Sequence, residues 1–245
     1  MFRSRLVAVT GGDVFRDEYS LAFDGTDDYI AIPSTTYNVH NTAYSFVFWA
    51  KRNAINSWDI VLGNQSSSAL NFIIFDNDDG DRIMLEGSDG DNAVGACSVI
   101  ANRWYHFAVV PNGDGTVAMY QDAVPISVTY DGGGDLGSAS TFDSLGGGGT
   151  GNTFAGNISE IAIYNIALTA SQVRTLYNNR EPFNHREGSV SSSLTAWWRM
   201  GDGTEDIGTL QDGSPDFTIY DMSVNSNNAA TRSMAANSFT GDTPW

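Results

Sequence analysis

Lysine, cysteine and histidine are scarce in this chain. Its 245 residues contain one lysine (Lys51), one cysteine (Cys97) and three histidines, and 29 acidic residues outnumber 12 basic ones, which gives a net charge of −17. A surface that binds nucleic acid needs clustered Lys and Arg, so this balance excludes nucleic acid as a partner. A single cysteine excludes an internal disulfide framework.

Long apolar runs are also missing. No segment approaches the ~20 apolar residues of a membrane-spanning helix. The apolar run near the N-terminus, residues 6–9, is too short for a signal peptide. We therefore expect synthesis in a cytoplasm, no Sec export and no membrane insertion.

The chain does contain the alternation that is typical of β-strands. In Ser20–Pro33, Leu21 and Phe23 alternate with smaller residues before an acidic turn. Ile30 and Ile32 alternate with other residues after the turn. This pattern predicts a half-buried β-hairpin around which the remaining strands are organised.

Short strand-like segments separated by turns continue along the chain, and one helix follows them. About ten such strands predict an all-β sandwich or jelly roll. The helix is predicted near residues 169–178, where Thr169 caps a segment whose apolar face includes Val173 and Leu176.

Four segments, in this order, resemble one family. They are FDGTDDYIAIP (23–33), YSFVFWAKR (44–52), WYHFAVVPNGDGTVAMYQD (104–122) and GNISEIAIYNIALTASQVRTLYN (156–178). They are similar to the laminin-G-like modules of the concanavalin A-like lectin/glucanase superfamily. The resemblance implies an all-β, two-sheet antiparallel jelly-roll sandwich with one concave face. It leaves the activity open, because this fold carries lectins, hydrolases and adhesion modules.

The segment after the helix resembles the beginning of such modules. LTAWWRMGDG (194–203) and IYDMSVNSNN (219–228) are similar to the strand and loop that normally precede the FDG segment. We therefore expect an N-terminal arm, residues 1–19, and one jelly roll, residues 20–245, in which 190–245 supplies a permuted or swapped first strand. This order of segments resembles laminin-G-like proteins of tailed bacteriophages, which implies a virion component.

The acidic turn at 24–28 raises the question of a metal. Asp24, Asp27 and Asp28 repel one another unless water or a cation screens them. We name these three residues and Glu160 as candidate ligands of a structural Ca²⁺. The alternative is an acidic turn in which Asp24 hydrogen-bonds its own backbone. Further candidates, if the C-terminal segment packs near the turn, are Asp202, Asp221 and Asn225.

A sugar-binding site needs an exposed aromatic platform with polar groups around it. Trp58 lies in the polar stretch NAINSWD and is our candidate carbohydrate-binding residue. The tryptophans in strand-like runs are expected in the core: Trp49, Trp104, Trp197 and Trp198.

No catalytic motif is visible. Retaining glucanases of the resembled superfamily carry two Glu on one strand, as Glu-x-Asp-x-Glu or a version one residue longer, which places nucleophile and acid together. The six glutamates here are never within five residues of each other. This excludes that motif, although an Asp–Glu pair assembled from distant strands stays open.

These observations predict a non-catalytic structural or adhesion module. We expect a protein of the phage virion surface, a capsid decoration or fibre-type protein, that forms a homo-oligomer and contacts other virion proteins, cell-surface glycans or both. The first alternative is a stand-alone calcium-dependent lectin, and the second is a divergent glycoside hydrolase.

Overall fold

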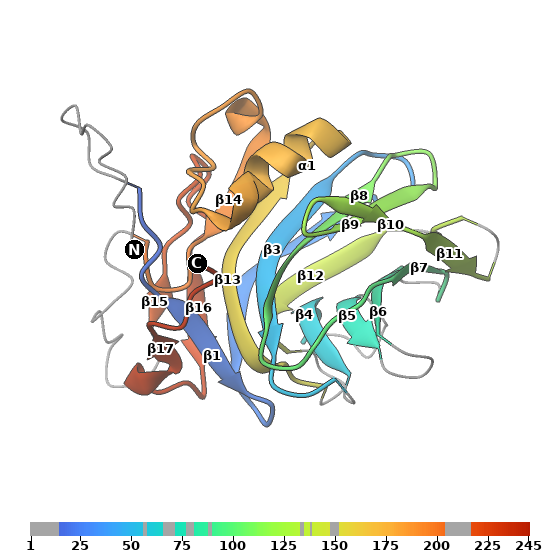
Figure 1. The fold of residues 1–245 in the computed structure, drawn as a ribbon. Coiled ribbons are helices and arrows are strands. Elements are labelled where there is room, and N and C mark those ends of the chain that lie inside the picture. The colour runs from blue at the N-terminus through green and yellow to red at the C-terminus, as the bar shows by residue number, and fades with distance from the viewer. Residues whose placement is uncertain are drawn as a thin grey trace, which may run out of the picture.

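Two antiparallel β-sheets stacked face to face make the body of the protein (Figure 1). The computed structural model describes residues 15–55, 58–65, 72–76, 81–87, 90–132, 135–137, 139–147, 152–203 and 217–245. Within these ranges there are an eight-stranded sheet, a nine-stranded sheet and one α-helix. The prediction of an all-β, two-sheet antiparallel jelly roll with one short helix is confirmed.

The eight-stranded sheet contains β1 (Ser20–Asp24), β3 (Ser45–Arg52), β8 (Trp104–Pro111), β9 (Val117–Gln121), β10 (Val124–Ile126), β13 (Ala155–Tyr164), β14 (Leu194–Trp198) and β17 (Phe239–Thr240). They are ordered β10-β9-β8-β3-β13-β1-β17, and β14 also pairs with β13. The nine-stranded sheet contains β2 (Tyr29–Tyr37), β4 (Asp59–Gly63), β5 (Phe72–Asp76), β6 (Arg82–Glu86), β7 (Asn92–Ala96), β11 (Val128–Asp131), β12 (Ser140–Leu145), β15 (Thr218–Ile219) and β16 (Ala229–Arg232). Its order is β11-β7-β6-β5-β4-β12-β2-β16-β15.

The hydrophobic core lies between the sheets because successive side chains of a strand point to opposite faces. On β3, Phe46 and Phe48 are fully buried in this core, whereas Val47 belongs to a second cluster on the outer face. On the opposite sheet, Ile73 and Phe75 of β5 complete the same core.

The second cluster is covered by α1 (Ala170–Tyr177), which lies across the outer face of the eight-stranded sheet (Figure 1). Thr169 caps the helix, since its Oγ1 accepts a hydrogen bond from the Gln172 amide at 3.3 Å. Val173 and Leu176 are the buried residues of the helix. In the described part of the chain, no helix is long and apolar enough to cross a membrane.

The predicted hairpin is an arch between the two sheets. β1 pairs with β13 and β17, whereas β2 pairs with β12 and β16, so the prediction that these two strands form a hairpin with each other is wrong. Alternation places Leu21 and Ile30 in the same core from opposite sheets, and the turn crosses the edge of the sandwich. Gly25 makes this turn with φ of +76°, a conformation that favours glycine.

The segment after the helix supplies strands to both sheets of its own chain. β14 pairs with β13, β17 pairs with β1, and β16 pairs with β2. In Figure 1 the red C-terminal strands accordingly lie beside the blue β1. Of the N-terminal arm, residues 1–14 lie outside the described residues. The backbone amides of Glu18 and Tyr19 both donate to Asp202 Oδ2, which fastens the described end of the arm to the loop after β14.

Candidate functional site

A cleft of about 310 Å³ opens on the outer face of the nine-stranded sheet, away from the core. We call it the Trp58 cleft. Its lining combines aromatic, apolar, acidic, basic and amide side chains: Trp58, Phe72, Ile74, Asp76, Arg82, Met84, Glu86, Asn92, Asp131 and Asn152.

The register of β5, β6, β7 and β11 sets this composition. Asp76 lies opposite Arg82, Glu86 lies opposite Asn92, and Asn92 lies opposite Asp131. Because every second residue of a strand faces the same side, these side chains form two polar rows on the outer face. An apolar row separates them and consists of Ile60, Ile74, Met84 and Val94. The cleft therefore has polar groups on both sides of an apolar floor.

Trp58 packs against the apolar floor and stays half-buried. It immediately precedes β4, whose first residue, Asp59, is fully buried and bonds the Arg52 guanidinium at 2.6 Å. This ion pair fixes the chain just beyond Trp58. The indole is thus held half-buried at the surface of the cleft, and its contact with a ligand stays a prediction.

Two buried polar atoms of the cleft have no hydrogen-bond partner. Arg82 Nε is a donor and Asn92 Oδ1 is an acceptor, and both are inaccessible to solvent. A buried polar group without a partner costs about 1–3 kcal/mol, so native structures keep few of them. Both residues line the Trp58 cleft, so a polar ligand there reaches these two atoms once Arg82 or Asn92 changes its side-chain rotamer.

The carboxylates of the cleft differ in their charge state. Asp76 forms an ion pair with Arg82. Glu86 is 5% exposed, and among the described residues no charge or hydrogen bond offsets its burial, which raises the pKa of its carboxyl to about 7. At neutral pH a large fraction of Glu86 is therefore a neutral carboxylic acid, which can donate a hydrogen bond as well as accept one.

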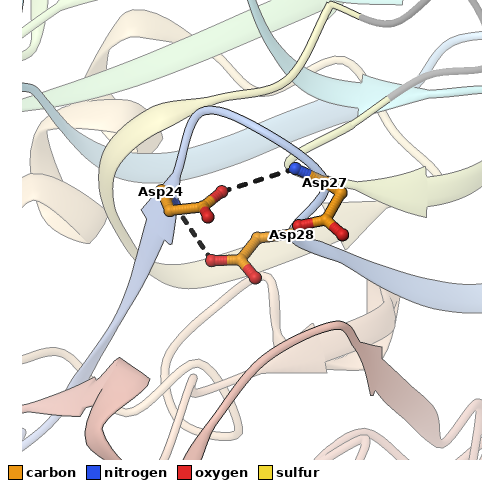
Figure 2. A group of neighbouring side chains, drawn as sticks. All are labelled: Asp24, Asp27 and Asp28. Carbon is orange, nitrogen blue, oxygen red and sulfur yellow. Dashed lines mark hydrogen bonds between the residues drawn. The ribbon is translucent and has the colours of Figure 1, made fainter.

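The acidic turn forms a separate cluster. Figure 2 shows Asp24, Asp27 and Asp28 gathered at the turn between β1 and β2, with their nearest carboxylate oxygens within 4.8 Å of one another. Asp24 Oδ1 accepts from the Thr26 amide at 2.7 Å, and Asp28 Oδ2 accepts from the Asp24 amide at 2.9 Å. Burial raises the pKa of Asp28. The backbone of the turn thus already uses two of the carboxylates, as the metal-free alternative expected.

The three carboxylates carry six oxygens, and backbone amides already bond two of them, whereas Ca²⁺ prefers six to eight oxygen ligands. The neighbouring cleft of about 310 Å³ adds polar side chains from the C-terminal segment, including Ser233 and Asn237. The donor set is therefore composed of oxygen-rich residues, and the fit to a cation depends on the free oxygens of Asp24, Asp27 and Asp28.

Glu160 does not join that cluster. It lies five residues further along β13 than Ala155, which pairs with Asp24, a separation of ~16 Å along the strand. A β-bulge at 159–162 gives Glu160 a φ of +51° and turns it to the outer face. There it accepts from Trp197 Nε1 at 2.5 Å and from Arg199 Nε at 2.9 Å.

Glu160 instead belongs to a buried cluster that the sequence did not reveal. Asp17 of the N-terminal arm accepts a hydrogen bond from Ser159 and lies 3.8 Å from the Arg199 guanidinium. Burial, and then the neighbouring Glu160, raise the pKa of Asp17 to about 12. We assign the shared proton to Asp17, since Glu160 has the shorter contact with Arg199. This cluster joins the arm to the sheet.

The other residues that the sequence singled out have structural positions. Asp221 accepts from the backbone amides of Trp197, Ser223 and Asn227, and Asp202 anchors the arm. Neither lies in the acidic turn. The tryptophans expected in the core are 1–6% exposed: Trp49, Trp104, Trp197 and Trp198.

The polar lining of the Trp58 cleft was missed at the level of the sequence. A signal was available in RIMLE (82–86), where alternation puts Arg82, Met84 and Glu86 on one face of a strand. The partners on β7 and β11 depend on register, which the alternation within one strand does not give.

Comparison with known proteins supports the architecture. Residues 24–174, more than half of the 245, match the family model described as the concanavalin A-like lectin/glucanases superfamily. No curated protein sequence matches the chain.

Two solved structures show the likeness of fold. A candidate carbohydrate-binding protein from Bacteroides ovatus superposes with a TM-score of 0.63 at 17% identity, covering 92% of this chain and 60% of that one. Domain 4 of AbnA, a GH43 extracellular arabinanase from Geobacillus stearothermophilus determined with arabinotriose, gives 0.50 at 22% identity, covering 64% and 76%. At these identities the likeness establishes the fold, and this chain spans less than two thirds of the Bacteroides protein. Together with the family match, the two-sheet jelly roll shows that this chain belongs to the concanavalin A-like lectin/glucanases superfamily.

Proposed function

We propose that this chain is a non-catalytic carbohydrate-binding module whose ligand lies in the Trp58 cleft. The observation that carries the proposal is the pair of buried, unpartnered polar atoms, Arg82 Nε and Asn92 Oδ1, in a cleft with an aromatic platform. A sugar ring offers an apolar C–H face to an indole and a set of hydroxyls that both donate and accept. The indole of Trp58 matches the C–H face. Arg82 Nε, a donor, and Asn92 Oδ1, an acceptor, match the hydroxyls, because neither has a partner within the protein.

The charges of the cleft favour an uncharged sugar. The guanidinium of Arg82 is neutralised by Asp76, while Asp131 at the rim is exposed. An acidic sugar would therefore meet Asp131 and the ionised fraction of Glu86 without a free cation to offset them. The similar arabinanase domain was determined in complex with arabinotriose. Neutral arabino-oligosaccharides are therefore the first ligands to test.

The test is binding of immobilised glycans, followed by titration calorimetry on the best ligand, with the intact chain and Trp58→Ala. We expect Trp58→Ala to weaken binding at the cleft at least tenfold, because stacking on an aromatic residue is lost. Asn92→Ala should weaken it as well. Trp245→Ala is the matched control, since Trp245 is also half-buried but packs against Trp49 outside the cleft. Equal binding by Trp58→Ala and the intact chain would contradict the proposal.

One observation favours hydrolysis as the second candidate. Glu86 and Asp131 lie in one row with Asn92 between them, about 10 Å apart at Cα by the spacing of strands. Inverting glycosidases hold an acid and a base roughly 6.5–9.5 Å apart, and Glu86 with its pKa of about 7 has the properties of an acid. Asp76 is ~13 Å from Glu86 along the strand direction, too far to take part.

Turnover separates the two candidates. Release of reducing sugar from a polysaccharide panel, lost in both Glu86→Gln and Asp131→Asn, would establish hydrolysis. Sugar binding without release, unchanged in Asp131→Asn, is the result that we expect.

We also propose a location on the virion surface and a bound calcium ion. The proposed location, with a homo-oligomer and other virion proteins as partners, is based on the similarity of WWRMGDG and its neighbours to phage-encoded modules. Co-purification with assembled capsids or tails tests it, and a monomer found only free in lysate would count against it. Calcium at Asp24, Asp27 and Asp28 is proposed from the cluster in the turn.

A further inference from the structure

A second and slightly larger cleft, of about 370 Å³, lies where β2 of one sheet approaches β14 of the other. We call it the Tyr44 groove. Its lining comes from β2, from the loops beside it, from β14 and from the loop after β15: Ile32, Pro33, Thr35, Thr36, Tyr37, Tyr44, Asn165, Thr195, Ala196, Trp198, Asn225 and Asn227. The Trp58 cleft shares none of these residues.

None of the described residues that line the Tyr44 groove is charged. Its twelve lining residues include three Thr, three Asn, two Tyr and one Trp, in a protein with a net charge of −17. Thr35, Thr36, Asn165 and Asn225 are exposed. The Thr35 hydroxyl donates to the Pro33 carbonyl and the Thr36 hydroxyl is hydrogen-bonded to that of Thr141. Tyr44 is half-buried and its ring meets that of Tyr37 edge to face at 5.1 Å. Such a lining suits a ligand that is rich in hydroxyl groups and carries no charge.

The amide rim is held in place by the groove's own backbone. The Thr195 carbonyl accepts from Asn225 Nδ2 at 2.8 Å and from Asn227 Nδ2 at 3.0 Å. The buried Trp198 donates its Nε1 hydrogen to the Asn227 carbonyl at 2.9 Å. Both asparagine amides are thus oriented, and their Oδ1 atoms remain as acceptors. Groups that are already ordered lose less entropy when a ligand binds.

We propose that the Tyr44 groove is a second carbohydrate-binding site, for an uncharged oligosaccharide. A peptide is the obvious rival, because β16 pairs with β2 only at Tyr29–Ala31 while β12 pairs with it as far as Tyr37. An extended peptide could therefore add to the β2 edge that β16 leaves open. However, Pro33 stands in that edge without an N–H to donate, and proline is a usual device against strand addition. A ligand is therefore recognised by the side chains of the groove and not by backbone pairing with β2.

The experiment uses the full chain with Trp58→Ala, which removes the first site. Cellotriose, maltotriose, mannotriose and arabinotriose are titrated separately, and the side-chain amide signals of asparagines are followed by ¹H–¹⁵N NMR. We expect at least one trisaccharide to bind with a stoichiometry of one and to shift the signals of Asn165, Asn225 and Asn227. Adding Thr36→Ala and Asn225→Ala should then weaken that binding at least tenfold.

Val224→Ala is the matched control, since Val224 is 89% exposed beside Asn225 but does not line the groove. No saturable binding by any of the four sugars would overturn the proposal, as would binding that survives Thr36→Ala with Asn225→Ala. Preferential binding of an extended uncharged peptide would also overturn it. These outcomes are independent of the Trp58 cleft, whose own failure appears as unchanged affinity on Trp58→Ala alone.

Discussion

The two outer faces of this sandwich carry the same three residue types in opposite states. On the eight-stranded sheet, Trp197 and Arg199 both donate to Glu160, and the group is buried under the N-terminal arm. On the nine-stranded sheet, Trp58, Arg82 and Glu86 line an open cleft. There Arg82 Nε has no hydrogen-bond partner, and burial raises the pKa of Glu86.

This difference separates a structural use of these residues from a binding use. The three guanidinium nitrogens of Arg199 all have acceptors: Glu160, the Asp202 carbonyl and the Arg16 carbonyl. A group satisfied in this way holds the fold together and has nothing left to offer a ligand. In the Trp58 cleft, by contrast, Arg82 Nε and Asn92 Oδ1 have no partner within the protein, which costs the fold free energy that a ligand could recover.

The largest expected effect is that of Arg199→Ala. It leaves the carboxylate of Glu160 buried without its cation, so we expect a loss of about 3–5 kcal/mol in the free energy of unfolding. Urea denaturation followed by tryptophan fluorescence measures it. Arg174→Ala, on the exposed side of α1, is the control and should change stability by about 0.5 kcal/mol or less. A stable Arg199→Ala protein would mean that Glu160 is neutral in the folded state.

The two tryptophans give the next comparison. Trp197 is 1% exposed, so Trp197→Ala should cost about 3–5 kcal/mol through the cavity and the lost bond to Glu160. Trp58 is half-buried, and Trp58→Ala should cost about 1 kcal/mol while removing sugar binding at the cleft. The same denaturation and binding measurements check both variants. Equal losses of stability would show that Trp58 is a core residue.

The third prediction concerns pH. The folded pKa of Glu86, about 7, lies above its unfolded value, so folding favours the protonated form. Its contribution to stability is full below about pH 4.5 and is lost as the pH rises through 7. We expect this loss to be about 1–2 kcal/mol, because the cleft is open to water. Urea midpoints of the intact chain and Glu86→Gln at pH 5 and pH 8 should diverge by this amount.

The difference in urea midpoint between the intact chain and Glu86→Gln isolates the contribution of Glu86, because other titrating groups are the same in both. Asp17 also has a raised pKa, but at about 12 its effect continues to grow beyond pH 8. Burial lowers the pKa of His106 and His185 to about 3, so both favour the folded state less as the pH falls below 6.5. Since Glu86→Gln keeps these groups, a divergence that continued to grow above pH 8 would contradict the assignment to Glu86.

Local patterns predicted what depends on neighbours in the sequence. Alternation located the strands, Thr169 marked the start of the helix, and polar surroundings marked Trp58 as more exposed than the tryptophans of the strands. Pairing between distant segments was less accessible. Leu21 and Ile30 alternate as hairpin residues would, yet they face the core from opposite sheets, because alternation reports which side is buried and not which strand lies alongside.

Glu160 shows why the sequence grouped the candidate metal ligands only in part. We named it with the acidic turn as a candidate calcium ligand, but a bulge in β13 turns it towards Arg199 instead. A bulge shifts the alternation by one residue and leaves no mark in composition. The adjacent Asp24, Asp27 and Asp28 are brought together by the turn itself and were accessible from the sequence.

Calcium should produce the smallest effect and tests that turn. Because backbone amides already occupy carboxylate oxygens of Asp24 and Asp28, a bound ion adds less than it would in a site with free ligands. At 100 times its Kd, calcium would contribute about 2.7 kcal/mol, and we expect about 1 kcal/mol, or roughly 2–4 °C in Tm, at millimolar calcium. Asp27→Asn should remove this response at little cost to the metal-free protein, since Asp27 is exposed. Magnesium at the same concentration is the control, because it demands a tighter octahedral geometry than three clustered side chains supply. An unchanged Tm would leave the turn explained by its own hydrogen bonds, and an equal response in Asp27→Asn would place the ion elsewhere on this acidic surface.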